Sequence, residues 1–283
     1  MLTWLILCRL VKRDLYYDNG TTPFHLISEE KHNISYFDIS RQMQLILYRY
    51  YDAITEYRDE LRKNNGDVLC SCSDIFIDDP LTLHLHLSTD GGQLSTYRRH
   101  SIWPVHCTVL DLPLRLRSKR DNLIIISLWE SRHKPEWVTL LRQHLSDSII
   151  RKTTEMLIQG KMVKIHLRLH TAVFDLPATA SVLNHVQFNG KFGCLYCSAP
   201  GSVIKSGWGH SRKYGPIVDR LSDVQFEEYS DLAASVQESV LGIKGKSFLN
   251  GYVKIPSHIL LDPLHLIFEN CTKTLITKII VFF

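Results

Sequence analysis

Residues 83–92 read Leu-His-Leu-His-Leu-Ser-Thr-Asp-Gly-Gly, and this stretch decides the fold class. Apolar and polar residues alternate strictly from Leu83 to Leu87, which predicts a β-strand. The following Asp90-Gly91-Gly92 predicts a turn at its end. Residues 102–110 and 122–129 are rich in β-branched and aromatic residues and follow closely, so we expect an antiparallel meander of three strands.

A helix and a fourth strand come next. Lys134-Pro135-Glu136 predicts the start of a helix that runs to about Gln159. Residues 162–174 alternate again and predict a strand that ends at Asp175. A crossover through the helix favours parallel pairing of the fourth strand with the first. The order predicts an α/β fold with an RNase H-like core, in which a mixed sheet is flanked by helices.

The rest of the chain is predicted to be helices and loops. Helical spacing of apolar residues predicts one or two helices over 37–63 and single helices over 178–186, 219–241 and 257–279. We therefore expect three regions. They are an N-terminal helical and loop region (1–80), the core with its two strand-end aspartates (81–190), and a region with a CxxC insertion and a D-x-x-H helix (191–283).

Composition excludes several classes of protein. Hydrophobic residues make up 45% and charged residues 22% of 283 residues, which is ordinary globular usage and excludes disorder and coiled coils. Seven cysteines at uneven spacing suggest a reducing compartment. Residues 81–215 hold 18 Lys or Arg against 8 Asp or Glu, and this basic middle suits nucleic acid or is simply a solvated basic face.

Asp90 and Asp175 are the first candidate site. Both follow predicted strands, and parallel pairing would bring them to one sheet edge. Two carboxylates can hold the Mg²⁺ or Mn²⁺ ions of two-metal phosphoryl transfer. The alternative for each residue is an ordinary turn-forming aspartate.

Cys194 and Cys197 are the second candidate site. In an intracellular protein a CxxC can supply half of a zinc site, and His210 or His185 are candidates for further ligands. The alternative is a pair of buried thiols.

Asp262 and His265 form a third motif, D-x-x-H, whose spacing puts both on one helix face. The alternative is an N-capping aspartate beside a hydrogen-bonded histidine. Trp208, between glycines, is a candidate for stacking on a base, or else a core residue.

Three ordered blocks together resemble the CACTA-type (En/Spm-like) DDE transposases and their host-derived relatives. The first block is LHLSTDGGQLSTYRRHSIWPVHCTVLDLPLRLRSKRDNLIIISLW (85–129), followed by HKPEW (133–137). The second is VFDLPATASVLNHVQFNGKFGCLYCSAPG (173–201), and the third is ILLDPLHLIFENCTKTLI (259–276). The resemblance covers roughly residues 40–280.

The resemblance implies metal-dependent cleavage and transfer of DNA strands by the intact parent protein. Asp90 and Asp175 match the first two catalytic acids of the family, while Leu176-Pro177 departs from its usual second block. The third acid, a Glu, is expected beyond the D-x-x-H helix, and Glu269 does not match it. We therefore expect the chain to be a truncated and inactive fragment.

The resemblance also implies partners and a compartment. They are DNA, with a second copy or the intact transposase as a further partner, and a nuclear or cytoplasmic location without a membrane. Candidates for phosphate contacts are Arg98, Arg99, Arg115, Arg117, Lys119 and Arg120. The alternatives are a non-catalytic relic or host-adopted protein that binds nucleic acid or protein, and a structural zinc module.

Overall fold

The computed structural model describes residues 24–29, 32–63, 81–93, 101–146, 150, 152–206, 209–216 and 219–282. The chain divides into two compact units, Met1–His170 (unit 1) and Thr171–Phe283 (unit 2). The division falls within one strand, Lys161–Phe174.

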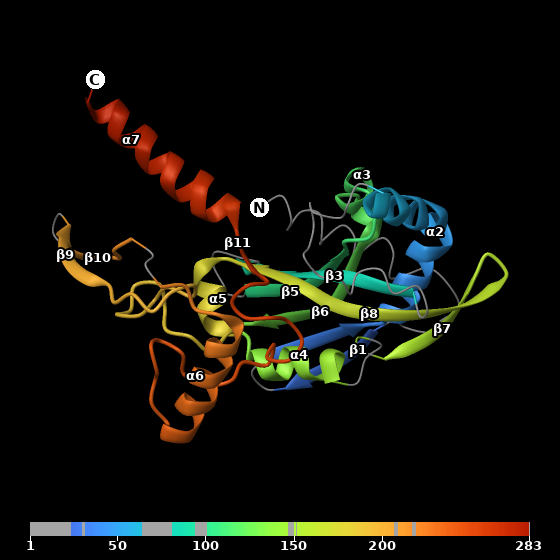
Figure 1. The fold of residues 1–283 in the computed structure, drawn as a ribbon, viewed down its shortest axis with the longest axis horizontal. Coiled ribbons are helices and arrows are strands. Elements are labelled where there is room, and N and C mark those ends of the chain that lie inside the picture. The colour runs from blue at the N-terminus through green and yellow to red at the C-terminus, as the bar shows by residue number, and fades with distance from the viewer. Residues whose placement is uncertain are drawn as a thin grey trace. The chain divides into compact units, whose positions relative to one another are not determined.

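Unit 1 is built on a mixed sheet in the order β1-β2-β6-β5-β3-β8 (Figure 1). β3 pairs with β5, and β5 with β6, in antiparallel register, which confirms the predicted meander. β4 pairs with β5, and β7 with β8. The strands are β1 (Phe24–Glu29), β2 (His32–Phe37), β3 (Leu81–Thr89), β4 (Gly92–Gln93), β5 (Ser101–Val109), β6 (Leu123–Ser131), β7 (Thr153–Ile158) and β8 (Lys161–Phe174).

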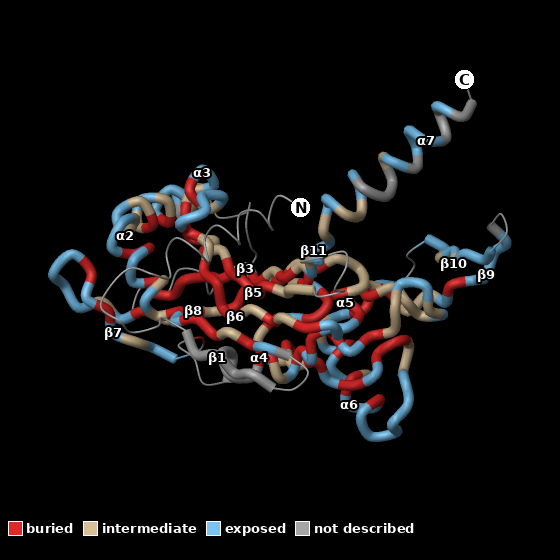
Figure 2. The backbone as a smooth tube through the Cα atoms, turned by 180° about the vertical axis from the view of Figure 1, so that it is seen from behind, coloured by how far each residue is buried: buried red, intermediate tan, exposed pale blue. Residues whose placement is uncertain are grey.

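The core of unit 1 lies along its central strands, which are mostly red in Figure 2. Leu83, Leu85 and Leu87 of β3 are fully buried, as their spacing predicts. His84, the polar residue between Leu83 and Leu85, is also buried and does not face water. β3 therefore has apolar cover on one face and a buried polar network on the other.

Helices complete unit 1. They are α2 (Ile39–Lys63), α3 (Leu114–Arg117), the 3₁₀ helix η2 (Arg120–Asn122) and α4 (Trp137–Ser146). α2 confirms the helix predicted over 37–63, and Tyr50 interrupts it with non-helical dihedrals. Gln42 of α2 bonds both the N–H and the C=O of Ile125, each at 2.8 Å. This amide fastens α2 to β6 next to the irregularity in β5–β6 pairing.

The helix predicted from 134 to 159 is wrong in its second half. α4 ends at Ser146, and residues 153–158 form β7, which pairs with β8. Gln159 and Gly160 have φ values of 49° and 80°, as a two-residue hairpin turn of the primed type requires. Gly160 thus marks a hairpin turn between two strands and not the end of a helix.

Unit 2 consists of short elements. They are α5 (Leu176–Val182), β9 (Ser202–Ser206), β10 (Gly209–Lys213), α6 (Asp223–Val236), β11 (Ile259–Leu261), the π-helix η3 (Leu264–Thr272) and α7 (Lys273–Phe282). α5 and α6 confirm predicted helices, with α6 starting in a Ser222–Gln225 capping box. The helix predicted from 257 begins as strand β11, because Ile259–Leu261 pair in parallel with Ala172–Phe174 at the end of β8.

The structure thus shows an α/β fold with a mixed sheet and flanking helices. Within the described residues, no helix combines the length and the apolar character needed to cross a membrane.

Candidate functional site

Asp90 lies at the end of β3, in the turn that the sequence predicts. It is half-buried, and the next residue, Gly91, is packed beneath the Trp103 indole. A Cβ on Gly91 would lie 2.4 Å from that ring, so the turn requires glycine. Trp103 in turn meets Trp137 edge-on, with ring centroids 5.7 Å apart. The backbone beside the Asp90 carboxylate is therefore held by two tryptophans.

Asp175 follows β8 and is the N-cap of α5. Its Oδ1 accepts a hydrogen bond from the Ala178 N–H at 2.6 Å. Among the described residues no hydrogen bond reaches the second oxygen, Oδ2. The cap fixes the carboxylate at the strand end and leaves one oxygen available to a ligand, so the turn-forming and ligand interpretations are compatible for this residue.

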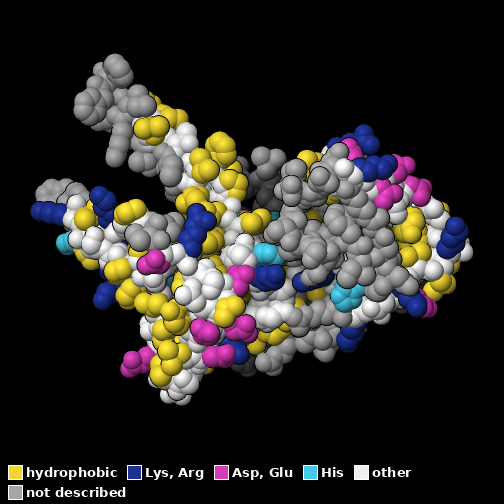
Figure 3. Space-filling view, viewed as in Figure 1, with side chains coloured by type: hydrophobic (Ala, Val, Ile, Leu, Met, Phe, Trp, Pro, Cys, Tyr) yellow, Lys and Arg dark blue, Asp and Glu magenta, His cyan; other side chains and the backbone are white. Residues whose placement is uncertain are grey.

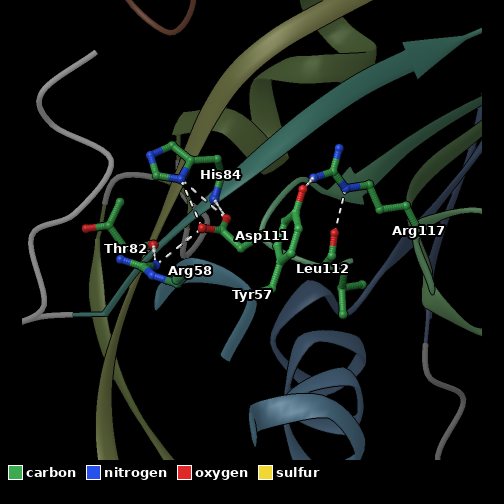
Figure 4. A network of polar contacts seen from close by, with 7 residues as sticks. All are labelled: Tyr57, Arg58, Thr82, His84, Asp111, Leu112 and Arg117. Carbon is green, nitrogen blue, oxygen red and sulfur yellow. Dashed lines mark hydrogen bonds and ion pairs between the residues drawn. The ribbon is translucent and has the colours of Figure 1, made fainter. Parts of the chain in front are cut away.

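A buried polar network in unit 1 was not predicted from the sequence (Figure 4). Asp111 lies just after β5, and its Oδ2 accepts a hydrogen bond from the backbone N–H of His84 at 2.6 Å. The His84 ring nitrogen Nδ1 lies 3.3 Å from the same oxygen. Arg58 of α2 lies 3.3 Å from Oδ1 of Asp111 and donates to the carbonyl of Thr82. The carboxylate thus ties α2 to β3 and to the end of β5.

More histidines surround this network. The His84 and His170 rings meet edge-on with centroids 5.4 Å apart, and Ser88 Oγ lies 2.7 Å from Nε2 of His106. Burial, with the charge of His86 as a smaller cause, lowers the pKa of His106 to about 4. Burial and the charge of Arg117 lower the pKa of His86 as well. Because burial opposes their protonation, His106 and His86 are mainly neutral at pH 7.

The predicted cysteine pair comes together in unit 2. The Cys194 and Cys197 thiols interact, and burial, followed by this interaction, raises the pKa of Cys194. Cys197 is buried. Tyr196 lies between the two cysteines in the sequence, and its hydroxyl donates to the Ile259 carbonyl at 2.8 Å. Two adjacent thiols are the geometry that half of a zinc site or a pair of buried thiols would share.

Neither histidine proposed as a further zinc ligand joins the pair. His210 is exposed on β10, opposite Lys205. His185 is buried, and its Nδ1 lies 2.9 Å from the Val186 carbonyl. Across the described ranges, no group of three or more His, Cys, Asp and Glu side chains is arranged to hold a metal ion.

The D-x-x-H motif closes on itself at the start of η3. Asp262 Oδ2 meets Nδ1 of His265, and Oδ1 accepts from the Leu264 N–H at 2.8 Å. The geometry is that of a local cap beside a hydrogen-bonded histidine, and both side chains remain partly exposed.

The predicted phosphate contacts divide into three groups. Arg115, Lys119 and Arg120 are exposed around α3 and η2. Arg117 is used internally, because it donates to the Leu112 carbonyl at 2.6 Å and to the Tyr57 hydroxyl at 3.2 Å. Arg98, Arg99 and Trp208 lie outside the described residues.

The fold and these sites define an α/β protein with strand-end carboxylates in each unit. A family model described as "Protein of unknown function (DUF1258)" matches residues 34–225, and the chain belongs to this family. No curated protein matches the chain.

Proposed function

We propose that this chain derives from a CACTA-type DNA transposase and contains its RNase H-like core. In this proposal Asp90 and Asp175 hold the divalent metal ion used in cleavage and transfer of DNA strands. The RNase H-like topology requires the first strand of a meander to lie beside the fourth strand, and both strands to end in an acid.

The strand order is the observation that carries the proposal. β3 lies between β5 and β8, as the predicted core requires. Asp90 follows β3 directly, and Asp175 follows β8 directly and starts a helix. β11 pairs in parallel with the end of β8 and extends the sheet by one strand.

The donor chemistry fits a hard divalent cation. Carboxylate oxygens are the ligands that Mg²⁺ and Mn²⁺ prefer, and Oδ2 of Asp175 has no hydrogen-bond partner in the described part of the chain. A bound ion would activate the attacking oxygen and stabilise the leaving oxygen of a phosphodiester. The protein's own part is to fix the two carboxylates, through the Ala178 cap in one case and the Trp103-packed turn in the other.

The test is Mn²⁺ binding by the full chain, measured from the EPR signal of free Mn²⁺. Asp90→Asn and Asp175→Asn are the informative variants, since asparagine keeps the N-cap of α5 while it removes the charge. We expect each to weaken Mn²⁺ binding by at least about tenfold. Asp121→Asn, which removes an exposed acid from η2, is the matched control and should leave binding unchanged.

Unchanged Mn²⁺ affinity in both strand-end variants would overturn the proposed metal site. If the chain binds DNA but no Mn²⁺, the alternative of a non-catalytic nucleic-acid-binding protein replaces the proposal. A parallel assay with supercoiled plasmid and Mn²⁺, with EDTA as the blank, detects any strand cleavage that depends on the same two acids.

The cysteine pair could supply two ligands of a zinc site, which is a separate proposal. Zinc content near one per chain, lost in Cys194→Ser and Cys197→Ser, would indicate a structural zinc in unit 2. Zinc-free protein with unchanged stability in both variants would leave the interpretation of buried thiols.

A further inference from the structure

A two-stranded ribbon in unit 2 carries positive charge without acidic neighbours. β9 and β10 pair in antiparallel register and contain Lys205, His210, Arg212 and Lys213. The surrounding residues 176–218 contain four Lys or Arg and no Asp or Glu. At the left edge of Figure 3, where Figure 1 places the ribbon, dark blue and cyan side chains stand out.

The base of the ribbon is fixed by Arg212 of β10 and by Tyr214, which directly follows this strand. Arg212 donates to the carbonyl of Asn189 at 2.8 Å and to that of Gly201 at 2.6 Å. The Tyr214 hydroxyl accepts from the Gly193 N–H at 3.1 Å and lies 2.7 Å from the Phe188 carbonyl. The ribbon is therefore anchored to the segments before and after the cysteine pair.

Two glycines allow Tyr214 and Arg212 to pack closely against the backbone. A Cβ on Gly193 would lie 2.5 Å from the Tyr214 hydroxyl oxygen, and a Cβ on Gly201 would lie 2.6 Å from the Arg212 side chain. Any larger residue would push the second strand away from the loop. The sequence thus provides a rigid support for a ribbon whose other side chains are exposed.

The exposed side chains of the ribbon are cations, small residues and the apolar Val203 and Ile204, which are 57% and 41% exposed. Lys205 and His210 are directly opposite each other and share one face, and Lys213 is opposite Ser202 on the other. All four are exposed, and among the described residues neither lysine has an ion-pair partner. Unpaired, exposed cations on both faces suit a partner that surrounds the ribbon with negative charge.

The β7–β8 hairpin shows a contrasting arrangement of charge. In the β7–β8 hairpin of unit 1, Lys164 is directly opposite Glu155, so the charges on that face balance. Lys161 and Lys164 are exposed as the ribbon lysines are. The β9–β10 ribbon differs, because neither of its strands contains an Asp or a Glu.

We propose that the β9–β10 ribbon enters the major groove of duplex DNA, with Lys205 and Lys213 contacting phosphates on the two sides. The major groove of B-DNA, about 12 Å wide, admits a two-stranded ribbon. Lysine contacts to phosphate position a protein on the duplex and carry little sequence information. The choice of DNA as the polyanion rests on the proposed function, whereas the ribbon itself rests on its charge and anchoring.

The experiment measures the affinity of the full chain for a labelled B-DNA duplex of about 20 base pairs over a range of salt concentrations. Lys205→Ala/Lys213→Ala removes two exposed cations and should leave the fold intact, because neither lysine anchors the ribbon. We expect weaker binding and a slope of log K against log salt that is smaller by about 2. The matched control, Lys161→Ala/Lys164→Ala, removes two exposed cations from unit 1 and should keep the slope.

A double-stranded RNA of the same length is the second probe. The A-form major groove is deep and narrow, so a ribbon that reads this groove should lose little RNA affinity in the double variant. An unchanged DNA slope, or an equal fall in the control, would overturn the proposal. An equal loss for RNA and DNA would overturn groove insertion and indicate a general polyanion surface.

Failure of the ribbon and failure of the proposed function give different results. Mn²⁺ binding that depends on Asp90 and Asp175 beside an unchanged DNA slope contradicts the ribbon alone. The opposite result contradicts the metal site alone. In that case the salt slope of DNA binding is smaller in the ribbon variant, while Mn²⁺ binding is unchanged in Asp90→Asn and Asp175→Asn.

Discussion

Asp111 and His84 in unit 1 form the same pair of residue types as Asp262 and His265 in unit 2, in a very different setting. The first two side chains are each 4% exposed, and Arg58 completes their network (Figure 4). The second two are 22% and 31% exposed and close one helical turn. The buried pair is built from residues 27 positions apart in the chain, and the exposed pair from residues three apart.

This difference in burial indicates which pair stabilises the fold. A buried charge costs free energy unless it is paired, so removing one partner from the Arg58–Asp111 contact leaves an uncompensated charge. An exposed pair is solvated with or without its partner and contributes little to stability. The buried pair is therefore structural, whereas the partly exposed pair contributes little to stability.

The largest expected effect is that of Asp111→Asn. It leaves the buried Arg58 guanidinium without its counter-charge, and we expect a loss of about 3–5 kcal/mol in the free energy of unfolding. Urea unfolding followed by tryptophan fluorescence measures this, because Trp103, Trp129 and Trp137 all lie in unit 1. A loss below about 1 kcal/mol would show that the network is not what holds α2 to β3.

The next effect is a dependence of stability on pH that comes from His106. Its pKa is about 4 in the folded protein, below the ordinary value of 6.5. Below pH 6.5 the unfolded chain therefore binds a proton that the folded chain excludes, and stability falls as the pH falls towards 4. We expect a loss of about 2 kcal/mol from this group between about pH 7 and pH 5.

His106→Gln tests this origin, because it removes the titrating group from the buried face. The difference between unfolding free energies at the two pH values should shrink by about the same 2 kcal/mol. His210→Gln, at an exposed position in unit 2, should leave the difference unchanged. An undiminished difference in His106→Gln would assign the pH dependence to the other buried histidines.

A smaller effect than that of Asp111→Asn is expected at Asp175, which is half-buried. Asp175→Ala removes the cap bond to Ala178 and should cost about 1 kcal/mol. Asp175→Asn keeps an oxygen at that position and should cost only a few tenths of that. Equal losses in the two variants would mean that charge, and not capping, determines the contribution of Asp175 to stability.

The smallest effect is expected for Asp262→Asn, the counterpart of Asp111→Asn. An asparagine oxygen can still accept from the Leu264 N–H, and only the exposed contact with His265 weakens. We expect the free energy of unfolding to change by less than about 1 kcal/mol. A loss as large as that of Asp111→Asn would remove the distinction between the structural pair and the partly exposed pair.

Local patterns predicted much of this molecule. The alternation of 83–87 and 162–174 predicted β3 and β8, and the segments between them predicted β5 and β6 with the correct antiparallel pairing. The turn at Asp90, the helix after Asp175, the adjacent thiols and the closed D-x-x-H turn also follow from spacing within a few residues. Their assignment to metal chemistry stays a prediction.

Other features could not be predicted from local patterns. The segment 153–158 has apolar spacing compatible with a helix, and only pairing with β8 makes it a strand. Ile259–Leu261 are extended because they pair with residues near 173. His84 looks like the solvent-facing member of an alternating strand, and it is buried because α2 and Asp111 cover it.

The sequence by itself determined the α/β class, the meander and the strand-end acids, because each depends on periodicity or on turn residues close together in the chain. Only the tertiary structure decided which polar residues are buried. Asp111 meets Arg58 and His84 across 53 and 27 positions, so their shared network exists only once α2, β3 and β5 have packed. Burial makes that network structural, since a charge is stable in a protein interior only when it is paired.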